Sequence, residues 1–102
     1  MYKVLLVEDE EIIRCGIRNS IPWAEFGCCV AGEAGNGEEG ARQIEELRPD
    51  IVITDINMPV MDGLAMLAAT KLKYDYAAVI LTGYSEFEYA REAIRYGVSG
   101  YV

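Results

Sequence analysis

Short runs of apolar residues alternate with helical patterns along the whole chain. Five of these runs are rich in strand-forming residues such as Val and Ile, and each is about as long as one β-strand. They lie at residues 2–7, 29–34, 51–55, 77–82 and 98–102. Between them, apolar residues recur every three or four positions, as on one side of an amphipathic helix. Uniformly apolar strands that alternate with helices predict an α/β fold, in which a parallel sheet is covered by helices on both faces.

The first two predicted helices have recognisable ends. The first spans about residues 10–20 and ends near Pro22. Its apolar side is formed by Ile13, Ile17 and Ile21. The second helix begins at Asn36, whose side chain is a typical cap with Glu39 as its partner, and it is stopped by Pro49.

Two more helices follow the same rules. The third is indicated by an apolar stripe that consists of Leu64, Leu67, Ala68 and Leu72. The fourth begins at a second capping box, Ser85 with Glu88, and ends at Gly97.

The charge balance limits the partners of the chain. Nine basic and seventeen acidic residues give a net charge of −8, which disfavours direct contact with nucleic acid or with an anionic membrane. No apolar run approaches the roughly 18 residues that a transmembrane helix needs. An odd number of cysteines, Cys15, Cys28 and Cys29, favours reduced thiols in a cytosolic protein. We therefore expect one soluble cytoplasmic domain over residues 1–102.

Histidine is absent from the chain, and its absence excludes several kinds of chemistry. It removes Ser-His-Asp and Cys-His catalysis and any Cys/His zinc site. The chemistry of this protein must therefore come from carboxylates, hydroxyls, lysine or a bound metal ion.

Acidic and polar residues stand at the carboxyl ends of the predicted strands. Glu8 and Asp9 follow the first strand, Asp55 ends the third, and Thr82 ends the fourth. Ligands of a parallel sheet bind at this edge, so we expect these side chains to converge. Two carboxylates about 4 Å apart repel by about 4 kcal/mol at an effective dielectric constant of 20, and a bound cation relieves that repulsion. Oxygen ligands favour Mg²⁺, although Asp55 taken alone could be a turn former and Thr82 an ordinary strand residue.

Four segments, in their order and spacing, resemble the receiver domain of bacterial two-component response regulators. They are "VLLVEDE", "VITDINMPVMDG", "ILTGYSEFEYA" and "GVSGYV". The resemblance covers the whole chain and implies a flavodoxin-like fold, with a five-stranded parallel sheet of order 2-1-3-4-5. The segments "GYSEFEYA" and "IPWAEFG" are similar to the subgroup whose receiver precedes an AraC-type helix-turn-helix domain.

The resemblance implies a role for each matched residue of the acidic cluster. Asp55 is the expected phosphoacceptor, which attacks the phosphoryl group of a phosphohistidine on a sensor histidine kinase. Asp9 and Asp55 are expected to bind Mg²⁺ through their side chains, Glu8 through a water molecule, and Asn57 through its backbone carbonyl. The family more often has Asp at the position of Glu8. Mg²⁺ neutralises oxygen charge during phosphoryl transfer.

The resemblance also implies a switch and an output. Thr82 is expected to hydrogen-bond the new phosphoryl oxygen, and Tyr101 to move between exposed and buried positions in response. The added charge would bias a two-state element and so control a downstream DNA-binding domain. The receiver itself is expected to make no contact with nucleic acid or membrane, to form a homodimer in some cases, and to have no enzyme activity beyond its own phosphorylation and dephosphorylation.

The chain ends inside the expected fifth strand, so the resemblance predicts a receiver without its fifth helix and without the lysine that follows this strand. Helix five would cover one face of the sheet beside helix one. We therefore expect apolar residues of strands one and three to be open to water.

Other functions remain open on the sequence alone. A Mg²⁺-dependent phosphatase with an aspartyl-phosphate intermediate typically needs an acid two positions after the nucleophile, where this chain has Asn57. A flavodoxin-like cofactor protein should offer amides and hydroxyls to a phosphate in its first loop, whereas "EDEE" would repel one. A receiver-like interaction module that is never phosphorylated is the third alternative.

Overall fold

A computed structural model describes residues 1–56, 58–81 and 100–101 of the chain. Strands and helices alternate as the apolar pattern predicts. The strands are β1 (Tyr2–Val7), β2 (Cys28–Ala34), β3 (Ile51–Asp55), β4 (Ala77–Leu81) and β5 (Gly100–Tyr101). The helices are α1 (Glu11–Ser20), the short 3₁₀ helix η1 (Trp23–Phe26), α2 (Gly37–Leu47) and α3 (Gly63–Thr70). The fourth helix predicted between Ser85 and Gly97 lies outside the described residues.

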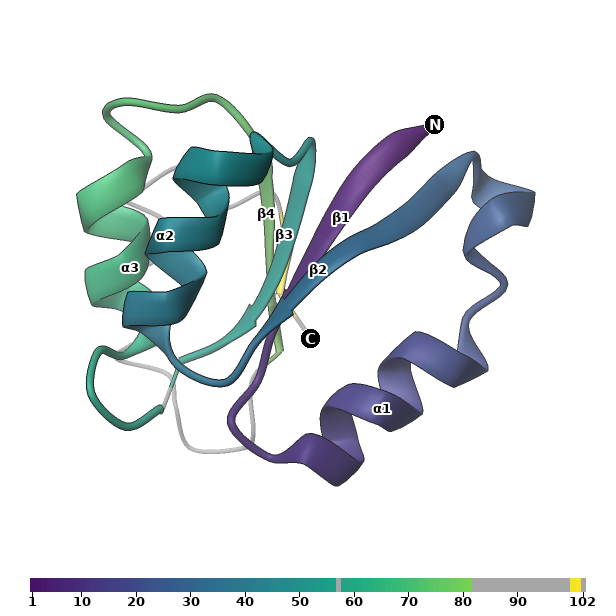
Figure 1. Ribbon diagram of the computed structural model, residues 1–102, viewed down its shortest axis with the longest axis horizontal. Helices are drawn as coiled ribbons and strands as arrows, with labels where there is room; N and C mark the ends of the chain where they lie inside the picture. Colours follow the sequence, from purple (N-terminus) through teal and green to yellow (C-terminus); the bar gives the residue numbers. More distant parts are fainter. Residues whose placement is uncertain (57, 82–99, 102) are drawn as a thin grey trace.

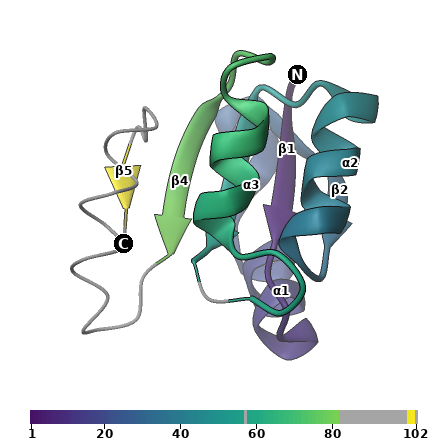
Figure 2. The ribbon, with the colours of Figure 1, turned by 90° about the vertical axis from the view of Figure 1, so that its left-hand side faces the viewer.

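The five strands form one parallel sheet in the order β2-β1-β3-β4-β5. The registers are regular in the centre, where Val4 of β1 lies beside Ile51 of β3 and Ile51 lies beside Ala77 of β4. Figure 2 shows β5 at the edge of the sheet, beside β4. The predicted α/β fold and strand order are both confirmed.

Within the part of the chain that the structure describes, helices lie on both faces of the sheet. Figure 1 shows α2 and α3 together on one face and α1 on the other. The larger core lies under α2 and α3, and its fully buried members include Leu5, Ile44, Val52, Leu67 and Ile80. The paired helices thus hold β1 and β3 firmly side by side, and these two strands carry the acidic residues.

The smaller core lies under α1, and it corrects the expectation for strand one. Val4 and Leu6 of β1 are buried there with Cys28, although we expected the apolar residues of strand one to be open to water. Ile51 and Ile53 of β3 are half-buried on the same face. The prediction was therefore wrong for strand one, because side chains of α1 and η1, together with those of the neighbouring strand β2, pack against Val4 and Leu6.

Two residues predicted to pack on helices are exposed. Leu72 is 94% exposed because α3 ends at Thr70, before it reaches Leu72. The Thr70 hydroxyl hydrogen-bonds to the Met66 carbonyl and to the Tyr76 hydroxyl. Ile13 of α1 is 44% exposed, so the predicted apolar side of this helix is only partly covered.

The predicted cap of α2 is confirmed, and a second cap becomes visible. Asn36 Oδ1 accepts a hydrogen bond from the Glu39 backbone N–H at 2.8 Å. Asp62 caps α3 in the same way, accepting from the Ala65 backbone N–H at 2.8 Å. Each side chain satisfies an N–H group that the first turn of a helix leaves without an intrahelical partner.

All three cysteines are free thiols, as expected. Within residues 1–56, 58–81 and 100–101, the structure contains no helix with the length and apolar character needed to span a bilayer.

Candidate metal centre

The carboxyl ends of β1 and β3 bring three carboxylates together. Glu8 and Asp9 directly follow β1, and Asp55 is the last residue of β3. One carboxylate oxygen from each residue lies within 4.8 Å of the others. The convergence predicted from the strand ends is therefore confirmed for these three residues, because β1 and β3 are neighbours in the sheet.

The three carboxylates differ in their exposure to water. Glu8 is buried, with 5% of its surface exposed, whereas Asp55 is half-buried and Asp9 is exposed. Burial raises the pKa of Glu8 to about 7, and the negative charges of Asp55 and Asp9 act in the same direction. The backbone N–H of Glu10, which donates to Glu8 Oε1 at 3.2 Å, lowers this pKa in part. Such a buried carboxylate beside two others favours a cation at this edge of the sheet.

The loop after β3 folds back tightly over Asp55. The backbone N–H of Ile56 donates to Asp55 Oδ1 at 2.7 Å, which orients the carboxylate. Gly63 at the start of α3 donates its N–H to the Ile56 carbonyl at 2.8 Å. A Cβ atom at Gly63 would lie 2.2 Å from the Asp55 carbonyl oxygen, so only glycine fits this approach without a shift.

A second glycine joins this loop to α2. Gly37 donates its backbone N–H to the Met61 carbonyl at 2.8 Å, and a Cβ atom at Gly37 would lie 2.2 Å from the same oxygen. Met58 and Met61 pack against the larger core. The loop between Asp55 and α3 is thus held at both ends.

Three predicted site residues are not placed by the structure. Asn57 and Thr82 lie outside the described residues. The backbone of Tyr101 pairs with Ile80 of β4, but its side chain is not among the parts described. Their roles therefore stay predictions.

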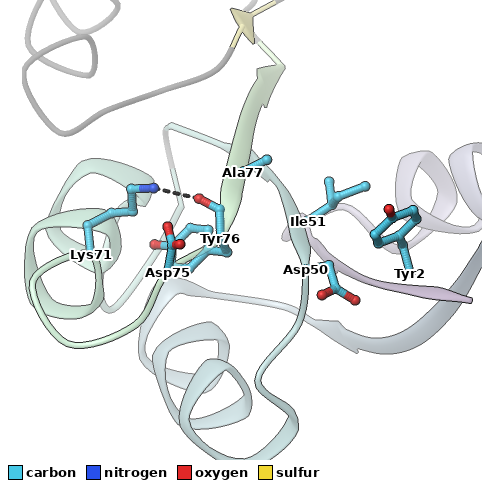
Figure 3. A pocket seen from close by; sticks show the side chains of 7 residues that line it. All are labelled: Tyr2, Asp50, Ile51, Lys71, Asp75, Tyr76 and Ala77. Atoms are coloured by element: carbon cyan, nitrogen blue, oxygen red, sulfur yellow. Dashed lines mark hydrogen bonds between the residues drawn. The ribbon is translucent and has the colours of Figure 1, made fainter.

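A cavity of about 590 Å³ lies at the opposite end of the strands. Its lining comes from the amino ends of β1, β3 and β4, from the residues just before β3 and β4, and from the residue that follows α3. These residues are Tyr2, Asp50, Ile51, Lys71, Asp75, Tyr76 and Ala77 (Figure 3). Lys71 Nζ donates to the Tyr76 carbonyl and lies 4.6 Å from the centre of the Tyr76 ring. This cavity is remote from the three carboxylates, and Lys71 is held beside it by these contacts with Tyr76.

Sequence reasoning missed an arginine that reaches the acidic loop. Arg14 of α1 donates from Nη1 to the Glu8 carbonyl at 2.7 Å, and it pairs with Glu33 of β2. The spacing of Arg14 and Arg18, four residues apart on one helix, is the signal that could have suggested a shared acidic partner.

These features define a receiver-like α/β protein with an acidic cation site at the carboxyl edge of its sheet. Residues 4–102 match the response regulator receiver domain family, and the chain belongs to that family.

Relatives and solved structures agree with this assignment. The chain is 43% identical over its whole length to the uncharacterized transcriptional regulatory protein YesN of Bacillus subtilis, and it spans 28% of that protein. It is 36% identical to the transcriptional regulatory protein HptR of Staphylococcus aureus, of which it spans 40%. The solved receiver domain of AraT, a response regulator from Geobacillus stearothermophilus, superimposes with a TM-score of 0.93 at 44% identity, covering 99% of this chain and 79% of that one. The chain thus corresponds to less than half of the curated relatives it matches.

Proposed function

We propose that residues 1–102 act as one receiver domain that accepts a phosphoryl group on Asp55 from a sensor histidine kinase. The observation that carries this proposal is the cluster of three carboxylates, whose oxygens lie within 4.8 Å of one another at the carboxyl ends of β1 and β3. The membership of the chain in the receiver family supports the same assignment.

The donor set fits Mg²⁺. Carboxylate oxygens are the ligands that this ion prefers, and it keeps several water molecules when it binds few side chains. In the proposal, Asp9 and Asp55 bind it directly, Glu8 binds through water, and Asn57 contributes its backbone carbonyl. When bound, Mg²⁺ neutralises negative charge on the phosphoryl oxygens.

Asp55 is the residue that receives the phosphoryl group. A carboxylate oxygen of Asp55 forms the new bond to phosphorus, while the bond from phosphorus to the histidine nitrogen of the kinase breaks. The N–H of Ile56 holds the Asp55 carboxylate in one orientation, and such positioning supplies much of the catalysis in phosphoryl transfer. Later attack of water on phosphorus breaks its bond to the Asp55 oxygen, which releases inorganic phosphate and returns Asp55 to its free carboxylate form.

The output follows from the same event. Thr82 hydrogen-bonds the new phosphoryl oxygen, and Tyr101 changes its position as Thr82 moves. In a longer cytoplasmic protein, this change controls a DNA-binding domain of the AraC type. Homodimerisation of the receiver is one route by which the change reaches that domain.

The assignment of Asp55 is tested by phosphorylation with acetyl phosphate and Mg²⁺, followed by mapping of the modified residue by mass spectrometry. Beryllofluoride with Mg²⁺ should occupy the same site. Asp55→Asn should abolish both effects. Asp50→Asn is the matched control, because Asp50 directly precedes the same strand and its carboxylate accepts the Lys3 backbone N–H at 2.7 Å, away from the metal centre. Modification of another residue, or an unchanged signal in Asp55→Asn, would refute the proposal.

A further inference from the structure

Two arginines of α1 bind one carboxylate of β2. Arg14 Nε lies 3.1 Å from Glu33 Oε1, and Arg18 Nη1 lies 2.6 Å from Glu33 Oε2. The backbone carbonyl of Glu33 accepts a hydrogen bond from Gln43 of α2 at 2.6 Å. Glu33 is therefore fixed by its strand and by α2, and it anchors the side of α1 that carries the two arginines.

The Arg14 side chain also reaches the acidic loop directly before Asp9. Its Nη1 donates to the Glu8 carbonyl at 2.7 Å, and the Arg14 backbone N–H donates to the Glu10 carbonyl at 2.9 Å. The arginine side chain thus holds the residue before Asp9, whereas the bond to Glu10 is the first backbone hydrogen bond of α1 and would form with any non-proline residue at position 14. Asp9 is exposed, and one of its carboxylate oxygens lies within 4.8 Å of an oxygen of Glu8 and of one of Asp55.

Arg14 and Arg18 share the single negative charge of Glu33, so the three side chains together carry one net positive charge. The Arg14 side chain is 18% exposed, and the ion pair lies between two parts of the fold. Both arginines share that net charge, whereas it is Arg14 that donates to the Glu8 carbonyl. The contribution of Arg14 to the metal centre comes from its hydrogen bonds and their geometry.

We propose that Arg14, anchored by Glu33, is a positioning residue of the Mg²⁺ site that fixes the backbone directly before Asp9. The inference deepens the proposed function and rests on it, since it requires that the acidic cluster binds Mg²⁺. Groups that orient metal ligands typically change metal affinity by about 10- to 100-fold when they are removed. We expect about a 10-fold loss here, because Arg14 acts on the backbone beside a ligand.

The test compares Mg²⁺ binding by isothermal titration calorimetry in four forms of the chain. Arg14→Met keeps the apolar stem and removes the donors. Arg14→Lys keeps the charge but lacks the planar fork that spans Glu33 and the Glu8 carbonyl. Arg18→Gln is the matched control, because Arg18 shares Glu33 as its partner and lies one turn farther along α1. Both Arg14 variants should bind Mg²⁺ about 10-fold more weakly, and Arg18→Gln should bind it as the wild type does.

A second readout separates positioning from a loss of folding. In acetyl-phosphate labelling, Arg14→Met should need about 10-fold more Mg²⁺ for half-maximal rate and should approach the wild-type rate at saturating Mg²⁺. Equal Mg²⁺ affinities of Arg14→Met and the wild type would overturn the inference alone. Wild-type affinity in Arg14→Lys would also overturn it, because charge would then suffice. A wild-type chain that binds no Mg²⁺ would refute the proposed function itself.

Discussion

Replacement of Asp9 by Asn should stabilise the metal-free protein. Asp9 contributes an oxygen that lies within 4.8 Å of an oxygen of Glu8 and of one of Asp55. At this distance, one pair of unit charges repels by about 3.5 kcal/mol at an effective dielectric constant of 20, and by about 0.9 kcal/mol in bulk water. Asp9 is exposed, so the true repulsion lies between these limits. We expect Asp9→Asn to raise the free energy of unfolding by about 1–2 kcal/mol in EDTA.

The assay is thermal unfolding followed by circular dichroism at pH 8, where Glu8, with a pKa of about 7, is mostly ionised. For a domain of this size, each kcal/mol raises the melting temperature by about 4–8 °C. Mg²⁺ at about 100 times its dissociation constant should stabilise the wild type by about 2.7 kcal/mol. Asp9→Asn should gain much less from Mg²⁺, since it has lost a ligand.

Asp75→Asn is the matched control for the change in net charge. Asp75 is an exposed aspartate at the amino end of the strands, beside the cavity of Figure 3. Asp75→Asn should raise the metal-free melting temperature less than Asp9→Asn does. It should leave the gain in stability from Mg²⁺ unchanged. If Asp9→Asn melts at or below the wild-type temperature in EDTA, or gains as much from Mg²⁺ as the wild type, the electrostatic reasoning is refuted.

Two further changes test the surroundings of the cluster. The pKa of Glu8 is raised from 4.5 to about 7 in the folded protein, so its contribution to metal-free stability is present below pH 4.5 and is lost as the pH rises toward 7. Glu8→Gln should flatten this part of the pH profile of urea unfolding, and parallel profiles for the two proteins would contradict the raised pKa. Gly63→Ala should destabilise the chain by about 1–3 kcal/mol, because its Cβ would lie 2.2 Å from the Asp55 carbonyl oxygen. Gly16→Ala in α1, where a Cβ meets nothing within 4 Å, should instead stabilise by about 0.5–1 kcal/mol in the same denaturation assay.

Local sequence patterns determined the secondary structure of this protein and the placement of its acidic residues. The alternation of apolar strands with helices follows from side-chain periodicity, which acts over a few residues and is visible in any single segment. The same holds for Glu8, Asp9 and Asp55, because residues that follow the carboxyl ends of parallel strands all lie at the same end of the sheet. The cap at Asn36 is equally local, since it involves a residue three positions away.

Contacts between distant segments were decided by the tertiary structure. Arg14 meets Glu33 across 19 positions of sequence, and only the packing of α1 beside β2 brings them together. The need for glycine at position 63 arises from the approach of a carbonyl eight residues earlier. The exposure of Leu72 and the cover of Val4 depend on where helices end and on which side of the sheet they pack. Periodicity shows that a residue has an apolar neighbour on its own helix or strand, but the surface that the residue meets is set by the assembled fold.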